Sequence, residues 1–209
     1  MSVTQALIAF VVAAGLLTIT PGLDTALVLR TAAVEGPRKA WLAAFGVCLG
    51  TLGWGAMVAL GIGALIAASP VAFEVLKWAG CAYLVWLGVN LILKPRDRFD
   101  VAAAAGAAPD TRRAWLWKGA LNNLLNPKAG VFYVSFLPQF VPHGVPAAPW
   151  MFMLAAIHDV LGLIWFAAII GATRPISGVL QKAAVVRWLD RITGGVFLGF
   201  GVRLALTRR

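Results

Sequence analysis

Six long apolar stretches make up most of the sequence, and their length is the strongest constraint on the fold. They cover residues 3–33, 40–67, 71–93, 114–141, 149–173 and 189–206. A helix that crosses a bilayer needs roughly 17–25 mainly apolar residues, so each stretch is long enough for one span. Only 12% of the residues are charged, against about 25% in soluble domains, so most of the outer surface must face lipid. The sequence therefore predicts an all-α integral membrane protein with a single transmembrane domain, residues 1–209.

The positive charges are unevenly distributed among the loops that join these stretches. Thirteen of the 18 Lys and Arg residues fall in or beside the first, third and fifth loops, whereas the second loop has only Lys77 and the fourth has none. Because cytoplasmic loops carry an excess of Lys and Arg, we expect the odd-numbered loops in the cytoplasm and both termini outside. Three arginines near the C-terminus oppose this orientation mildly. The net charge of +10 is explained by topology and does not indicate a nucleic-acid partner.

Two of the stretches contain a proline close to polar residues. Pro21 interrupts the first stretch and Pro127 interrupts the fourth. Proline lacks an N–H and clashes with the preceding turn, so it breaks or kinks a helix, and Gly22 lets the backbone open further. Backbone groups that lose their helical partners inside a membrane must face a cavity or buried partners. We therefore expect helices 1 and 4 to be interrupted at Pro21 and Pro127.

The two halves of the chain resemble each other. The third stretch ends with the pattern x-G-V-x-L-x-L at residues 87–93, and the sixth ends with the same pattern at residues 200–206. The proline breaks also fall in corresponding spans. Because three spans per unit is an odd number, the second unit must enter the membrane upside down, as in many transporters. We expect two inverted three-helix repeats, residues 1–93 and 114–209, joined by a cytoplasmic linker of residues 94–113.

Interrupted helices at matching positions of two repeats point to a substrate site near the membrane midplane. The candidate substrate-binding residues are Thr20, Pro21, Gly22, Asp24, Asn123, Asn126, Pro127 and Lys128. The alternative is a pair of structural kinks that pack on neighbouring helices. The polar residues at both breaks favour the functional interpretation.

The charged residues Asp24, Lys128 and Asp159 lie within the apolar stretches. Each costs about 2.5–3.5 kcal/mol to insert, so they should face the interior of the bundle and find partners there. We expect Lys128 to pair with Asp24 or Asp159, and these two carboxylates are the candidates for proton coupling. The alternative is a fixed ion pair that only joins two helices. His158 is either a proton relay or a simple core histidine.

No catalytic motif or cofactor-binding pattern is present, and Cys48 and Cys81 lack the spacing of metal ligands, so we expect neither an enzyme nor a bound cofactor or metal. Export of a metal or another small ion is a competing function, because Asp, Asn and carbonyl oxygens also suit hard cations. An intramembrane enzyme or a scaffold is a third possibility. The small residues Gly46 and Gly50 could serve a homodimer or pack within one chain.

Two motifs resemble those of the lysine-exporter (LysE/RhtB) family of amino-acid exporters. The segment Thr20-Pro21-Gly22-Leu23-Asp24 resembles the T-P-G-P-[ND] signature of the first helix, with Leu23 in place of the second proline. The segment from Asn123 to Ala129 resembles the N-x-x-N-P-K-A segment of that family. An acidic residue before an aromatic pair, Asp159 before Trp165-Phe166, and the terminal G-F-G-x-x-L are also similar, so the resemblance covers nearly the whole chain.

This resemblance implies a transporter of the bacterial inner membrane. Members of the family move amino acids or related small metabolites outward, in exchange for protons. The resemblance does not specify the substrate. If it holds, a zwitterion would meet the broken backbone at residues 20–22 and 126–128, with its ammonium group facing Asp24 or Asp159. Its carboxylate would face Lys128 or the N-terminus of a half-helix.

Overall fold

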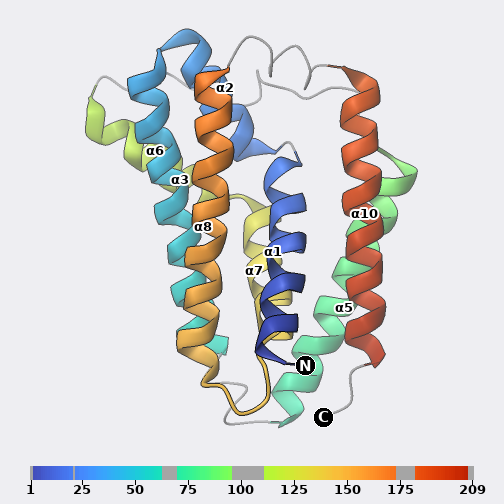
Figure 1. Cartoon of the computed structure of the whole chain (residues 1–209). Helices are drawn as coiled ribbons and strands as arrows, with labels where there is room; N and C mark the ends of the chain where they lie inside the picture. Colours follow the sequence, from blue (N-terminus) through green and yellow to red (C-terminus); the bar gives the residue numbers. More distant parts are fainter. Residues whose placement is uncertain (1, 21, 63–69, 96–110, 173–181, 207–209) are drawn as a thin grey trace.

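All the regular structure in the described part of the chain is helical (Figure 1). The computed structural model describes residues 2–20, 22–62, 70–95, 111–172 and 182–206. The helices are α1 (Val3–Ile19), α2 (Leu23–Val34), α3 (Pro37–Met57), the π-helical turn η1 (Val58–Ile62), α5 (Pro70–Leu93), α6 (Arg112–Leu124), α7 (Pro127–Phe136), the 3-10 turn η3 (Leu137–Phe140), α8 (Ala147–Gly171) and α10 (Ala183–Leu206).

Within the described residues, two helices are each long and apolar enough to cross a membrane. They cover Pro37–Gly61 and Ala147–Gly171, with mean hydropathies of 1.7 and 2.1. A third candidate span is the pair α1 and α2, which bend by 51° at their break. Only 28% of the apolar window of α8 is buried inside the protein. Such an apolar outer face is suited to lipid.

The helices form two groups around a central pair (Figure 1). In the view of Figure 1, α3, α6 and α8 lie on one side, α5 and α10 lie on the other, and α1 and α7 lie between them. The chain runs in opposite directions through α3 and α8, through α5 and α10, and through the broken helices α1–α2 and α6–α7. The start of α1 and the end of α10 lie at the same end of the molecule.

Two helices begin before the apolar stretches predicted for them. Helix α10 begins at Ala183, six residues before the predicted span, because Val186 is buried in the bundle and extends its inner face. Helix α6 begins at Arg112, inside the predicted linker, and Thr111 caps it by accepting a hydrogen bond from the Ala114 N–H at 3.3 Å. Residues 96–110 of that linker lie outside the described residues.

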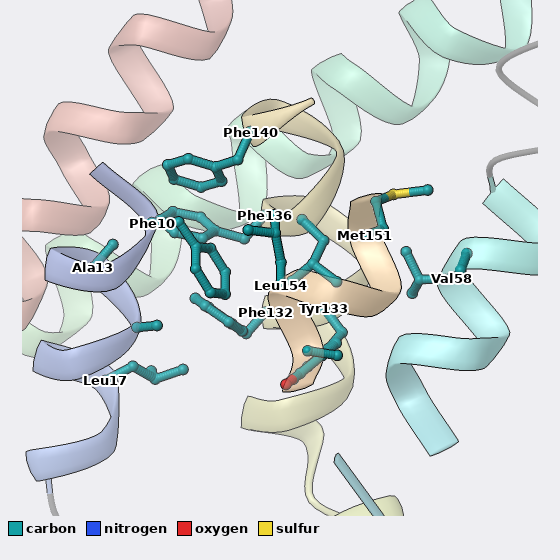
Figure 2. Packing of buried hydrophobic residues seen from close by; sticks show 14 of the residues in the cluster. Phe10, Ala13, Leu17, Val58, Phe132, Tyr133, Phe136, Phe140, Met151 and Leu154 are labelled. Atoms are coloured by element: carbon teal, nitrogen blue, oxygen red, sulfur yellow. The ribbon is translucent and has the colours of Figure 1, made fainter. Parts of the chain in front are cut away.

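An aromatic cluster fixes α7 between α1 and α8 (Figure 2). Phe10 of α1 packs edge-on against Phe140 of η3, with ring centroids 5.5 Å apart. Phe132 and Phe136 of α7 pack with their ring centroids 4.7 Å apart, and the fully buried Leu154 of α8 belongs to the same cluster. Phe and Tyr side chains bury large areas, so this cluster holds the position of α7 relative to its neighbours.

The glycine-rich face of α3 packs inside the chain against α6. Gly46 faces the backbone of Leu116 and Ala120, and Gly50 faces Ala120 and Asn123. Small residues allow two helix backbones to approach closely in a membrane. This face is therefore covered by the same chain and is not open to a second copy.

Candidate functional site

The first span is interrupted where Pro21 was expected to break it. Helix α1 ends at Ile19 and α2 begins at Leu23, while Pro21 itself lies outside the described residues. The hydroxyls of Thr18 and Thr20 donate hydrogen bonds to the carbonyl oxygens of residues 14 and 16, at 2.8 and 2.7 Å. These are bonds from a side chain to the carbonyl four residues earlier in the helix, and the Leu16 carbonyl also accepts the Thr20 N–H at 3.1 Å. The hydroxyl of Thr20 also forms a hydrogen bond with that of Thr193 in α10, which links the break to the other helix group.

The second interruption has a well-defined cap. Helix α6 ends at Leu124 and α7 begins at Pro127, which occupies the first helical position. A proline is favoured there because its missing N–H would have no partner in any case. The side-chain oxygen of Asn126 accepts a hydrogen bond from the Lys128 N–H at 3.0 Å. The predicted interruption of helix 4 at Pro127 is therefore confirmed.

The two interruptions meet at the carboxylate of Asp24. Its Oδ1 accepts a hydrogen bond from the side-chain amide of Asn122 at 2.7 Å. Its Oδ2 accepts hydrogen bonds from the amides of Asn123 at 3.0 Å and of Asn126 at 3.1 Å. Asp24 also lies in the first turn of α2, where the helix dipole favours a negative charge. The carboxylate thus joins α2 to the end of α6 and to the cap of α7.

Lys128 provides the reciprocal connection, from α7 back to α1. Its ammonium group donates hydrogen bonds to the carbonyl oxygens of Thr20 at 3.1 Å and Leu17 at 3.4 Å. Carbonyls at the C-terminal end of a helix carry partial negative charge, so they suit a cation. Lys128 and Asp24 both line the cavity between the two interruptions. Each interruption therefore supplies partners for the other.

A cavity of about 80 Å³ lies between the interruptions and α8. Predicted site residues in its wall are Thr20, Gly22, Asp24, Asn123, Asn126, Lys128 and Asp159. Further residues in its wall are Thr18, Cys48, Thr51, Tyr133, His158 and Trp165. Six helices contribute to this wall, so it forms only once the bundle is assembled.

Asp159 differs from Asp24 in its surroundings. It lies on α8, is 8% exposed, and lies beside the thiol of Cys48 in the cavity wall. Three amides share the oxygens of Asp24, whereas a thiol is a weak donor. Of the two cavity carboxylates, Asp159 therefore has more capacity for a further donor.

His158 is part of a hydrogen-bonded chain. Its Nε2 lies 3.1 Å from the hydroxyl oxygen of Thr18, and its Nδ1 lies 2.8 Å from the hydroxyl oxygen of Tyr133. The rings of Tyr133 and His158 stack with centroids 5.7 Å apart. This chain joins α1, α7 and α8 at the cavity, so the histidine has defined partners at both ring nitrogens.

Several members of this site are not among the residues assigned to it from the sequence. Asn122 carried a usable signal, because Asn122 and Asn126 have the i, i+4 spacing of neighbours on one helix face. Tyr133 and Trp165 carried none, because an aromatic residue in an apolar helix gives no sign of facing a cavity.

The site contains both donors and acceptors of hydrogen bonds. In the parts of the chain that the structure describes, no three His, Cys, Asp or Glu residues gather closely enough to hold a metal ion. The cavity wall can instead present a carboxylate, an ammonium group and hydroxyls to a small polar molecule.

Comparisons with known proteins identify the family. A leucine efflux protein of Enterobacter sp. (strain 638) is 31% identical, over 94% of this chain and 93% of that protein. A homoserine/homoserine lactone efflux protein of Salmonella typhi is 30% identical, over 96% of each. A threonine efflux protein of Salmonella typhimurium is 29% identical, over 90% of this chain and 92% of that protein. No solved structure matches the chain. The model of the LysE type translocators matches residues 16–208, so this chain belongs to that family of membrane transporters.

Proposed function

We propose that this protein exports small amino acids across the bacterial inner membrane and binds them in the cavity between its two helix interruptions. The observation that carries the proposal is the cavity wall, which combines the Asp24–amide cluster, the Lys128 ammonium group and the Asp159 carboxylate. The relatives named for efflux of leucine, threonine and homoserine support this substrate class.

The size of the cavity agrees with a small substrate. To hold one water molecule, a cavity needs about 10–15 Å³, counted as the space open to the centre of a water-sized sphere. The volume given above is counted in the same way. The volume of about 80 Å³ therefore corresponds to roughly five to eight waters. Small amino acids have about this number of non-hydrogen atoms. Drug-sized ligands occupy clefts of about 300–1,000 Å³.

The charges suggest how the zwitterion binds. Its ammonium group faces Asp159, which has acceptor capacity to spare, and its carboxylate lies toward Lys128. Asp24 is held by its three amides, and we assign it mainly to joining the two interruptions around the substrate. The backbone at Thr20, Gly22 and Asn126 completes the wall.

We propose that residues 1–93 and 114–209 form two inverted repeats with six spans, the odd-numbered loops cytoplasmic and both termini outside. The sequence echo pairs Gly88 with Gly201, an offset of 113 residues, and the same offset pairs Cys81 with Gly194. The Cys81 thiol donates to the Gly201 carbonyl at 3.1 Å. Gly194 in turn faces Gly88, whose added Cβ would lie 2.7 Å from the Gly194 carbonyl oxygen. A two-fold axis exchanges these two contacts, which supports the repeat.

The substrate class can be tested in proteoliposomes that contain the purified full-length chain. Liposomes loaded with leucine, threonine or homoserine should release at least one of them under an acidic exterior. Empty liposomes give the background rate. Release of a divalent cation such as Mn²⁺, with every amino acid retained, would contradict the proposal and favour an ion exporter.

Asp159→Asn should uncouple export from the proton gradient. If the carboxylate binds either a proton or the ammonium group of the substrate, but not both, proton entry drives substrate exit. The side chain of asparagine carries no negative charge, so it can bind neither the proton nor the ammonium group as a carboxylate does. Stimulation of efflux by an acidic exterior should therefore disappear, and the KM for the substrate should rise. Exchange of substrate at saturating concentration, without a pH gradient, should continue. Full stimulation in the variant would remove Asp159 from the coupling and leave Asp24 as the candidate.

Lys128→Met should impair transport by loosening α7 from α1. The change removes the ammonium group that bonds the carbonyls of Leu17 and Thr20, and hydrogen bonds to charged groups contribute about 1.5–3 kcal/mol each. We expect at least a ten-fold drop in efflux and a lower melting temperature. Lys39→Met is the matched control, because Lys39 makes only weak interactions near the surface. These are a partly exposed ion pair with Glu35, worth about 0–1 kcal/mol, and a cation–π contact 5.8 Å from the ring centroid of Trp115. Equal effects of both changes would contradict the assignment.

A further inference from the structure

We infer that the indole N–H of Trp165 donates a hydrogen bond to the carboxylate of the substrate, which makes Trp165 a further substrate-binding residue. This inference rests on the proposed export of amino acids. It adds a neutral donor to a site in which Lys128 is the cationic donor.

The first observation is an unsatisfied donor in the cavity wall. Trp165 lines the cavity, and its Nε1 is buried with no acceptor among the described residues. Two half-buried tryptophans do have acceptors: Trp54 donates to the Asn123 carbonyl at 3.4 Å, and Trp150 donates to the Phe140 carbonyl at 2.8 Å. A buried donor without a partner pays the full desolvation penalty, so an arriving acceptor is favoured. Trp115 also has a buried N–H without an acceptor, but Trp115 is not part of the cavity wall.

The second observation is the spacing of polar groups along α8. Asp159, Gly162, Trp165 and Phe166 all line the cavity and share one face of the helix. Asp159 and Trp165 are six residues apart, which is about 9 Å along the axis. Side chains of a helix lean toward its N-terminus, so the indole leans back in the direction of Asp159. This distance accommodates the ammonium and carboxylate groups of one amino acid between the two side chains.

Gly162 keeps the space between these two side chains open. A Cβ added at Gly162 would have the Phe166 ring as its nearest neighbour, at 3.9 Å. The position could hold a methyl group without a clash, so its lack of a side chain leaves room for a ligand. Along this face of α8, the carboxylate of Asp159 is an acceptor, Gly162 leaves a gap, and the indole N–H of Trp165 is a donor. This order matches the ammonium group, Cα and carboxylate of an amino acid.

Lys128 does not make this donor redundant. Its ammonium group already bonds two carbonyl oxygens of α1. A carboxylate can accept about four hydrogen bonds, so one cation leaves acceptor sites unfilled. An indole N–H fills one of them without adding charge to the cavity.

The test compares leucine with 3-methylbutylamine, which is leucine without its carboxylate, in proteoliposomes of the full-length chain. Trp165→Phe should raise the KM for leucine about ten-fold or more, the effect of losing a hydrogen bond to a charged group. Inhibition by 3-methylbutylamine should be unchanged, because that molecule has no carboxylate to lose. If the wild-type chain transports threonine and not leucine, threonine and 1-aminopropan-2-ol replace this pair.

Two further variants make the result specific. Trp188→Phe is the matched control, because Trp188 is 66% exposed and lies outside the cavity wall. Trp165→Tyr retains an aromatic donor and should recover part of the affinity for leucine, and it also serves as the test if Trp165→Phe does not fold. An unchanged KM for leucine in Trp165→Phe, or an equal loss for leucine and the amine, would overturn the role of Trp165. A wild-type chain that transports no amino acid would overturn the proposed function itself.

Discussion

Asp24→Asn is expected to abolish transport and to lower the thermal stability of the purified protein. The carboxylate has two oxygens that accept three amide hydrogen bonds, whereas asparagine offers one oxygen and one NH₂ group. At least one of the three amides would then face another N–H. A buried polar group without a partner costs about 1–3 kcal/mol. For a chain of this length, each kcal/mol of lost stability lowers the melting temperature by about 2–4 °C.

The measurements for Asp24→Asn are substrate exchange in proteoliposomes and thermal unfolding in detergent. Glu35→Gln is the matched control, because it also replaces one carboxylate by an amide. Glu35 lies at the end of α2, where the hydrogen bond from Lys39 at 2.8 Å holds the pKa of its carboxyl below the usual value. That ion pair is partly exposed, so its loss should be nearly neutral. Wild-type exchange and stability in Asp24→Asn would show that the carboxylate does not join the two interruptions.

The interruptions could be predicted because their causes are local. Proline removes a backbone donor wherever it occurs, so Pro21 and Pro127 marked the ends of helices from the sequence alone. The charges of Asp24 and Lys128 could be placed in the interior by their insertion cost. Their mutual arrangement could not, because it depends on which helix end each side chain meets. The ammonium of Lys128 bonds carbonyls that exist as acceptors only because α1 stops at Ile19.

The aromatic residues and the histidine that α7 and α8 contribute to the cavity wall could not be assigned from the sequence, for a different reason. Whether Tyr133, His158 and Trp165 face a cavity depends on how these helices are rotated about their axes. The rotation is fixed by packing, chiefly the aromatic cluster around Phe132 and Phe136. Both helices are apolar on most of their surface, so hydrophobic periodicity does not distinguish the lipid-facing side from the inner side.

Gly119→Ala is expected to disrupt the packing of α3 on α6. A Cβ at Gly119 would collide with the carbonyl oxygen of Ala43 and would lie 2.9 Å from the backbone nitrogen of Val47. Gly46 meets α6 in the same way, so the two backbones touch at this crossing. Backbone atoms cannot move aside as a flexible side chain can. The added methyl group must therefore separate α3 from α6.

Separation of α3 from α6 would reach the site directly. Helix α6 ends with Asn122 and Asn123, which hold Asp24, and α3 supplies Cys48 beside Asp159. Overpacking of this kind costs about 1–3 kcal/mol and sometimes more. We expect loss of transport together with loss of a monodisperse peak on size-exclusion chromatography.

The control for Gly119→Ala is Gly195→Ala in α10, where an added Cβ has no atom within 4 Å. Alanine in an unobstructed helix interior is more favourable than glycine by about 0.5–1 kcal/mol, so this variant should be as stable as the wild type or slightly more stable. If Gly119→Ala lowers the stability and Gly195→Ala does not, the contact between α3 and α6, and not helix propensity, determines the effect of the added methyl group. A stable, active Gly119→Ala protein would mean that α3 and α6 can separate without moving Asn122 and Asn123 away from Asp24. In that case the carboxylate of Asp24, with its three amides, would hold the end of α6 in place without support from the glycine crossing.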